Sequence, residues 1–473
     1  MTAMAERIGR GGGEGRVLAE VRALFVLGLP LVLGQLAWVA MLTTDTVILG
    51  RLGPEALAVG GLGHSVVVVP MLFLIGLAQG GMPLMAHAVG ARAHHVRDVR
   101  RTVRQSFWAT GIVCLPVLAA LWHVGVLLRW IGQEPALAAA TQDYVRAVSP
   151  ILLTSTWYAI LRTFTATYGR QRASLIIALA QVPVNGVLAY GLVFGTFGLP
   201  AWGVVGAGIA SSLSGTAALV VLGLFLRFDR RFRRFHLMGR FWRPDGVRLM
   251  QIFRIGLPIG FTIGFEVLLF SMAAQIMGLL GALVLAAHQV ALQVSTVTFV
   301  VALGIGQAAS IRVGIASGAR DEEAVSRTGW TAIALGAGFM GAMAVVILLW
   351  RFPIVALFLP DVTAPDNRAV LDLAAGFLLF AGVFQVMDGT QVVASHLLRG
   401  LRDTRAPMIF ALLCYWLIGF VLCWLLAFPA GLGGTGVWLS FVVAIGTFAG
   451  LLVWRFAGRR RLPAYRDLFE RMA

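Results

Sequence analysis

Residues 25–30 read FVLGLP, and residues 253–258 read FRIGLP. The two blocks are 228 residues apart, and the Gly-Ala-Arg sequence at residues 90–92 returns after the same interval at residues 318–320. In the same register, Gly50 and Gly53 have counterparts at Gly278 and Gly281. This shared interval indicates that the chain contains two homologous halves.

The composition indicates a membrane protein, because 59% of the 473 residues are hydrophobic, only 12% are charged and the mean hydropathy is +0.86. A soluble core does not need so much apolar surface. A helix of about 20 apolar residues crosses ~30 Å of hydrocarbon. We therefore expect an all-α integral membrane protein with twelve spans, near residues 23–47, 57–86, 106–128, 145–167, 174–197, 204–226, 251–279, 283–311, 329–350, 371–397, 407–427 and 434–456. Two similar halves in a membrane protein favour a transporter, since a site between them can open to either side.

The basic residues orient these spans. All 38 are arginine, and most fall in the tails and in the connections that lie on one face of the predicted topology. The positive-inside rule places that face, and both termini, in the cytoplasm. The first 22 residues lack the apolar region of a signal peptide, so we expect the first span to remain as an anchor in a bacterial inner membrane.

The predicted organisation has five parts: a cytoplasmic tail (1–22), an N-terminal six-helix lobe (23–226), a basic linker (227–248), a C-terminal six-helix lobe (249–456) and a second tail (457–473). The linker contains eight arginines and five aromatic residues. Because it joins two spans, we expect it to lie on the anionic inner leaflet. The net charge of +17 is spread over many cytoplasmic segments, so we expect membrane lipids and no nucleic acid as partners.

Three of the 21 acidic residues fall well inside predicted spans: Asp45, Glu266 and Asp388. A carboxylate near mid-membrane costs at least ~2.5 kcal/mol on insertion scales, so it indicates a transport pathway, a proton relay or an ion pair. Such a group can exchange a proton or bind a cation. We interpret these three acids as cation-coupling residues. For each of them the alternative is a structural pair with an arginine.

Polar residues at helical spacing accompany the acids and predict a water-filled cavity. The alternative is that they form hydrogen bonds that hold neighbouring helices together. Each set shares one face of a predicted span in the second half: Gln385 and Gln391 beside Asp388, Gln289 and Gln293 beside His288, and Thr262 one turn before Glu266. In the first half the corresponding polar residues are Gln35, Gln181 and Asn185.

Several motifs resemble the multidrug and toxic compound extrusion (MATE) family, and within it the NorM-type branch. They are LAAHQVAL at residues 285–292, SIRVG at 310–314, QVMDGTQVV at 385–393, LRG at 398–400, DTR at 403–405 and, in the first half, TDT at 44–46. The resemblance implies twelve helices in two six-helix lobes related by a pseudo-twofold axis along the membrane normal.

The resemblance also implies a site. The NorM branch binds its coupling cation at acids matching Glu266 and Asp388, and a family tyrosine one turn before the latter is Phe384 here. Other members use an aspartate matching Asp45, with residues matching Gln181 and Asn185. The missing hydroxyl leaves both Na+ and H+ open as the coupling ion.

We therefore expect a monomeric antiporter, without enzymatic activity or cofactor, that exports amphipathic or cationic organic compounds in exchange for Na+ or H+. One alternative is a flippase for lipid-linked sugars, for which Arg162 and Arg254 are the available cationic residues. Another is an intramembrane aspartyl protease, but Asp388 is not preceded by the Gly-x-Gly of such enzymes. A channel is disfavoured because no repeated filter segment is visible.

Overall fold

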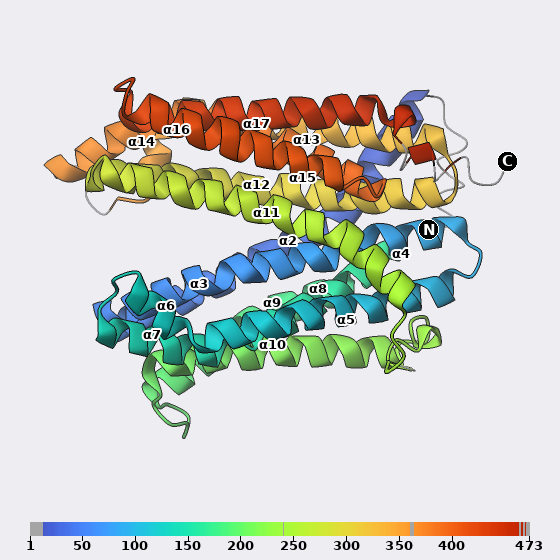
Figure 1. Ribbon diagram of the computed structural model, residues 1–473, viewed down its shortest axis with the longest axis horizontal. Helices are drawn as coiled ribbons and strands as arrows, with labels where there is room; N and C mark the ends of the chain where they lie inside the picture. The colour runs from blue at the N-terminus through green and yellow to red at the C-terminus, as the bar shows by residue number, and fades with distance from the viewer. Residues whose placement is uncertain (1–12, 240, 360–363, 463–464, 467–468, 470–473) are drawn as a thin grey trace. The chain divides into compact units, whose positions relative to one another are not determined.

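The structure is a computed structural model that describes residues 13–239, 241–359, 364–462, 465, 466 and 469. Every regular element in these residues is helical (Figure 1). Most of the predicted N-terminal tail (1–22) and part of the predicted C-terminal tail (457–473) lie outside the described residues.

Eleven helices of the described chain are long and apolar enough to cross a membrane, which agrees with eleven of the twelve predicted spans. The remaining prediction, near residues 145–167, falls on α7 (Pro135–Val148) and α8 (Ile151–Thr167). Ser149 and Pro150 form a turn between them. Proline has no N–H to continue the helical hydrogen bonds, so the predicted span is divided at this turn, and α8 has only 17 residues.

Two compact units make up the described chain. The N-unit is Leu33–Gly260, and the C-unit combines the described residues through Val32 with those from Phe261 onward. Besides α7 and α8, the N-unit contains α3 (Pro54–Gln79), α4 (Gly81–Ala91), α5 (His95–Trp122), α6 (Val124–Trp130), α9 (Arg172–Phe194), α10 (Gly203–Phe228) and η1 (Arg233–Phe235).

The C-unit contains α12 (Ala282–Gly318), α13 (Glu322–Ala356), α14 (Pro365–Gly400), α15 (Arg405–Ala411), η2 (Leu412–Phe420), α16 (Val421–Ala427), α17 (Gly433–Ala457) and η3 (Arg459–Arg461). Helix α14 packs against α12, α13 and α17. The aromatic residues Trp438, Phe441 and Phe448 of α17 are fully buried in this core. Large apolar side chains such as Leu349 and Trp454 are exposed, as lipid-facing residues are.

Two long helices divide between the units. Helix α2 (Gly13–Leu52) belongs to the C-unit through Val32, and α11 (Gly246–Leu279) belongs to the N-unit through Gly260. Each boundary lies two residues after the proline of the repeated block, Pro30 or Pro258. The first helix of each sequence half therefore begins within the compact unit formed mostly by the other half.

The glycine of the repeated block permits this arrangement. A Cβ on Gly28 of α2 would lie 3.5 Å from the carbonyl oxygen of Gly304 on α12. In the N-unit, a Cβ on Gly80 would lie 2.7 Å from the Cα atom of Gly256 on α11. Small residues let membrane helices approach at backbone distance. The repeated glycine thus lies at a helix contact in both units, and the contact is closer at Gly256, where a Cβ would lie 2.4 Å from the Leu77 carbonyl oxygen.

Candidate cation-coupling site

In the C-unit, Gln391 joins the two predicted acids. Its Nε2 atom donates to Asp388 Oδ1 at 3.1 Å and to Glu266 Oε1 at 3.3 Å. Asp388 and Gln391 lie on α14, where they are 5% and 2% exposed, and Glu266 is half-buried on α11. The structure therefore brings together two carboxylates that are 122 residues apart in the chain.

Gln385 extends this polar stripe by one turn of α14. Its Oε1 atom accepts from Thr298 Oγ1 at 2.9 Å, and its Nε2 donates to the Met340 carbonyl oxygen at 3.3 Å. These contacts fix α14 to α12 and α13. The predicted stripe is buried: Gln385 is fully enclosed, and Asp388 and Gln391 are nearly so. Sequence reasoning did not find Thr298.

Phe384, which stands where the resemblance implies a tyrosine, lies in an aromatic cluster. Its ring centroid is 6.2 Å from that of Phe270, 5.8 Å from Trp438 and 6.0 Å from Phe441. His288 joins the cluster at 5.6 Å from Trp438. Neither ring nitrogen of His288 has a hydrogen-bond partner within the described residues.

Tyr415 is a second buried polar residue of this core that sequence reasoning missed. It lies in the π-helical segment η2, is 0% exposed and packs on Phe448 at 5.1 Å between ring centroids. Its hydroxyl has no hydrogen-bond partner in the described part of the chain. A π-helical turn shifts the direction of the side chains that follow, and such turns are frequent at functional sites.

The other predicted residues of this half divide between buried and exposed positions. Thr262 is 4% exposed and lies one turn before Glu266 on α11. Gln289 and Gln293 are exposed on α12, whereas His288 is buried on another face of the same helix. The polar stripe of α12 is thus separate from the histidine that was predicted to accompany it.

The N-unit has its own acidic network around Asp45 on α2. Asn185 Nδ2 on α9 donates to Asp45 Oδ1 at 2.6 Å, and Ser211 Oγ on α10 donates to Asp45 Oδ2 at 2.8 Å. Ser214 Oγ donates to Asn185 Oδ1 at 2.9 Å. Sequence reasoning found Asp45 and Asn185 but neither serine, because small hydroxyl residues are common in membrane helices.

Gln181 and Gln35 are the remaining predicted residues of this half. Gln181 Nε2 lies 3.6 Å from Met41 Sδ, one turn before Asp45 on α2. Gln35 is half-buried on the same helix. Gln181 therefore lies beside the acidic network, whereas Gln35 lies ten residues before Asp45 on α2, and the contacts to Asp45 come from Asn185 and Ser211.

The chemistry of both networks is that of oxygen and amide groups. The described residues contain no group of three or more His, Cys, Asp and Glu side chains placed to hold a metal ion. Carboxylates with amides and hydroxyls suit a hard cation or a proton better than a transition metal. Each unit therefore contains a network of carboxylate, amide or hydroxyl groups around a partly or fully buried acid.

Comparison with known proteins identifies the family. The model of the family described as MatE matches twice, at residues 30–191 and 258–425. The two matches begin 228 residues apart, the interval of the repeated blocks.

Curated relatives match nearly the whole chain. A "Probable multidrug resistance protein NorM" of Mesorhizobium japonicum is 42% identical over 94% of this chain and 95% of its own length. A "Multidrug resistance protein NorM" of Burkholderia vietnamiensis is 38% identical over 91% of this chain and 92% of its own.

Solved structures share the fold. The crystal structure of the eukaryotic MATE transporter AtDTX14 matches with a TM-score of 0.84 and 21% identity, over 97% of this chain and 100% of that chain. A second match is an outward-facing multidrug resistance MATE family transporter of the MOP superfamily. Its TM-score is 0.81 and its identity 20%, over 95% of this chain and 96% of that chain. Together with the sequence matches, they make this chain a member of the MatE family, the multidrug and toxic compound extrusion family of transporters.

Proposed function

We propose that this chain is a secondary active multidrug efflux antiporter, which exports amphipathic or cationic organic compounds in exchange for Na+ or H+ by alternating access. The printed names of the NorM relatives support the multidrug substrates. The chain has no enzymatic role in this proposal.

The Gln391 bridge between Glu266 and Asp388 is the observation that carries the coupling mechanism. Two carboxylates at one amide repel each other when both are ionised, so the pair favours a partner that neutralises charge, either a proton or a cation. Release of that partner on the other side of the membrane restores the repulsion. The pair can therefore alternate between a loaded and an empty state.

Asp45 provides a second titratable site, in the N-unit. Asn185 donates to one of its oxygens and Ser211 donates to the other, and the same carboxylate can bind a cation or a proton. Inward movement of one net charge at 100 mV supplies ~2.3 kcal/mol, or roughly fiftyfold in the concentration of an uncharged drug. A monovalent cationic drug exchanged for one cation moves no net charge, so the concentration gradient of the coupling ion drives its export.

The membrane placement belongs to the same proposal. The chain is a multi-pass membrane protein with bacterial relatives. We place it in the inner membrane as a monomer, with both termini in the cytoplasm because the arginine-rich connections lie on that face. The two six-helix lobes at residues 23–226 and 249–456 are the repeats of the duplication, joined by the linker (227–248).

Transport by the purified full-length protein in liposomes tests this function. Ethidium export should accelerate when an inward Na+ gradient is imposed at equal pH, or when a proton gradient is imposed without Na+. The gradient that works identifies the coupling ion. Export that proceeds equally without either gradient would contradict antiport.

A further inference from the structure

The linker (227–248) connects two helices that are both apolar enough to span a membrane, α10 and α11. Because the connection is short, its two ends lie at the same face of the bilayer. Among the described residues of the linker, only the end of α10, the short helix η1 and the first turn of α11 are helical. Helix α5 nevertheless holds the second part of the linker, from His236 to Arg248.

Three side chains of α5 hold the backbone of the linker. Arg104 donates from Nε to the Leu237 carbonyl oxygen at 3.0 Å. Trp108 Nε1 donates to the Phe241 carbonyl oxygen at 3.0 Å, and Gln105 Nε2 lies 3.5 Å from that of Arg243. These donors recur at helical spacing, so one face of α5 binds successive carbonyl groups along the linker.

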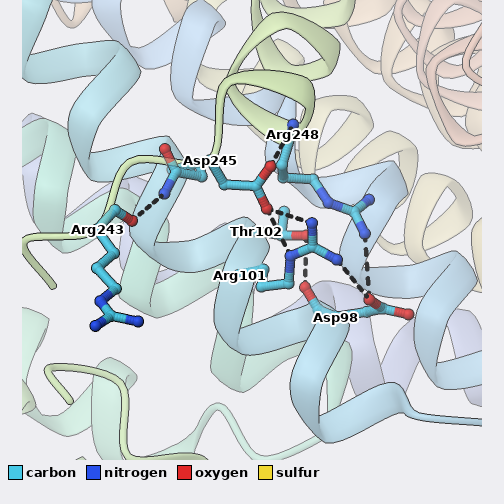
Figure 2. Close-up of polar contacts among 7 residues, drawn as sticks. Asp98, Arg101, Thr102, Arg243, Asp245 and Arg248 are labelled. Atoms are coloured by element: carbon cyan, nitrogen blue, oxygen red, sulfur yellow. Dashed lines mark hydrogen bonds and ion pairs between the residues drawn. The ribbon is translucent and has the colours of Figure 1, made fainter. Parts of the chain in front are cut away.

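Ion pairs hold the end of the linker (Figure 2). Arg101 Nε donates to Asp245 Oδ2 at 2.6 Å, and Arg248 Nη2 lies 3.4 Å from Asp98 Oδ1. Asp245 also accepts from the backbone N–H of Arg248 at 3.2 Å, as a helix N-cap does. Asp245, one of the two acids of the linker, thus accepts hydrogen bonds from the Arg101 side chain and the Arg248 backbone.

Two phenylalanines anchor the inner side of the linker. Phe232 and Phe235 are 3% and 1% exposed, and their ring centroids lie 5.3 Å and 5.1 Å from that of Phe164 on α8. The sequence-based expectation that the aromatic residues of the linker lie on the leaflet is therefore wrong for this pair. They belong to the protein core.

The outer side is basic and aromatic. Its exposed arginines, none of which has an ion-pair partner within the described residues, are Arg227, Arg230, Arg231, Arg233, Arg234 and Arg243. Phe228 and Trp242 are 73% and 82% exposed on the same segment. Tryptophan prefers the headgroup level of a bilayer, where its ring is in apolar surroundings and its N–H is hydrated.

We propose that the outer side of the linker is a binding surface for anionic phospholipid headgroups of the adjoining leaflet. The arginines neutralise the lipid phosphates, while Phe228 and Trp242 enter the headgroup layer. Because α5 already orders the backbone, little conformational entropy is lost on binding. Tethering to two spans keeps this surface at the bilayer, where lipid is present and nucleic acid is not.

The test uses full-length protein in nanodiscs with a polarity-sensitive fluorophore on Met238→Cys, since Met238 is 60% exposed and the native cysteines are buried. We expect phosphatidylglycerol, mixed into phosphatidylcholine, to shift the emission to the blue. In the double variant Arg230→Gln/Arg233→Gln, the blue shift caused by phosphatidylglycerol should be about tenfold smaller. Each basic side chain near the surface contributes separately to the attraction to anionic lipid. Added salt should weaken it further.

A matched control removes the same charge elsewhere in the N-unit, with Arg92→Gln and Arg97→Gln, which are also exposed. The control should respond like the unsubstituted protein. Equal loss in both variants would show only general attraction to the membrane and would overturn the proposal. The same shift produced by inorganic phosphate or by an RNA oligonucleotide over phosphatidylcholine alone would overturn it as well.

Discussion

Gln391 is the residue on which the coupling site of the C-unit depends, because a single amide nitrogen donates to both Glu266 and Asp388. A carboxamide cannot change its charge, so the net charge of the site depends on the two acids. Of these, Asp388 is the more enclosed, with 5% exposure. Its ionisation therefore has the larger consequence for the site.

Asp388→Asn should reduce gradient-driven ethidium export at least tenfold while leaving the protein monodisperse. The amide is nearly isosteric, and only the titratable charge is lost. Asp372→Asn, on the exposed surface of the same helix, is the matched control and should transport normally. Export at the unsubstituted rate by a folded Asp388→Asn protein would remove this acid from the mechanism.

Glu20 illustrates a charge with a structural role. It is 1% exposed on α2, accepts two hydrogen bonds from Arg312 at 2.5 and 2.7 Å, and accepts a third from Thr328 at 2.7 Å. All three residues lie in the C-unit. The network fixes the first part of α2 to α12 and α13.

Glu20→Gln should lower the free energy of unfolding by about 3–5 kcal/mol, because it leaves a largely buried guanidinium without its counter-charge. Thermal denaturation of the purified protein in detergent measures the effect. Glu323→Gln, whose side chain is 72% exposed, should change stability by less than about 1 kcal/mol. Equal midpoints for the two variants would contradict the structural role of Glu20.

Helices α2 and α11 are related elements with opposite charges at corresponding positions. Glu20 lies 228 residues before Arg248, and each forms an ion pair within its own compact unit, with Arg312 or with Asp98. The repeated glycine then provides close packing further along each helix. Both features hold the start of one sequence half against helices of the other.

Gly256→Ala should destabilise the protein, because the added Cβ would lie 2.4 Å from the backbone carbonyl oxygen of Leu77, which has little freedom to move. Overpacking of this kind costs about 1–3 kcal/mol. Gly264→Ala is the control on the same helix, since nothing lies within 4 Å of a Cβ there. The midpoint of thermal denaturation should be lower for Gly256→Ala than for Gly264→Ala. Equal destabilisation of the two variants would contradict close packing at Gly256.

Asp245 makes the docking of the linker sensitive to pH. Burial raises the pKa of its carboxyl, but the Arg248 N–H and the Arg101 side chain outweigh burial and hold the pKa below its ordinary value of 3.8. A carboxyl with a lowered folded-state pKa stabilises the protein above its unfolded pKa, and this contribution is lost as the pH falls through the folded value.

Asp245→Asn should therefore lower thermal stability modestly at pH 7, by about 1 kcal/mol or less for a partly exposed pair. The difference in thermal stability between this variant and the unsubstituted protein should become smaller as the pH falls below about 4. Asp143→Asn, at a carboxylate 62% exposed on α7, controls for loss of charge alone. A difference that is constant from pH 7 to acid would exclude the Asp245 carboxylate as its source.

The sequence predicted most of the architecture, since membrane spans are long apolar runs and the duplication is visible in short blocks. It also predicted Asp388 and Gln391 together, because they are one turn apart on one helix. It could not predict Ser211, Ser214 or Tyr415, whose positions depend on contacts between distant helices and on a π-helical turn. Nor could it predict that α2 and α11 divide between the compact units, because side-chain patterns do not record which half a helix packs against.

Both compact units contain an acidic network, and we infer that the network of Glu266, Asp388 and Gln391 carries a cation inward as a drug leaves. Drug-stimulated cation entry into proteoliposomes is the most direct test, with sodium uptake and internal acidification recorded in parallel during ethidium export. We expect one of these signals to rise with export and to disappear when Asp388→Asn is combined with Glu266→Gln. Ethidium export against its gradient with neither cation moving would contradict it.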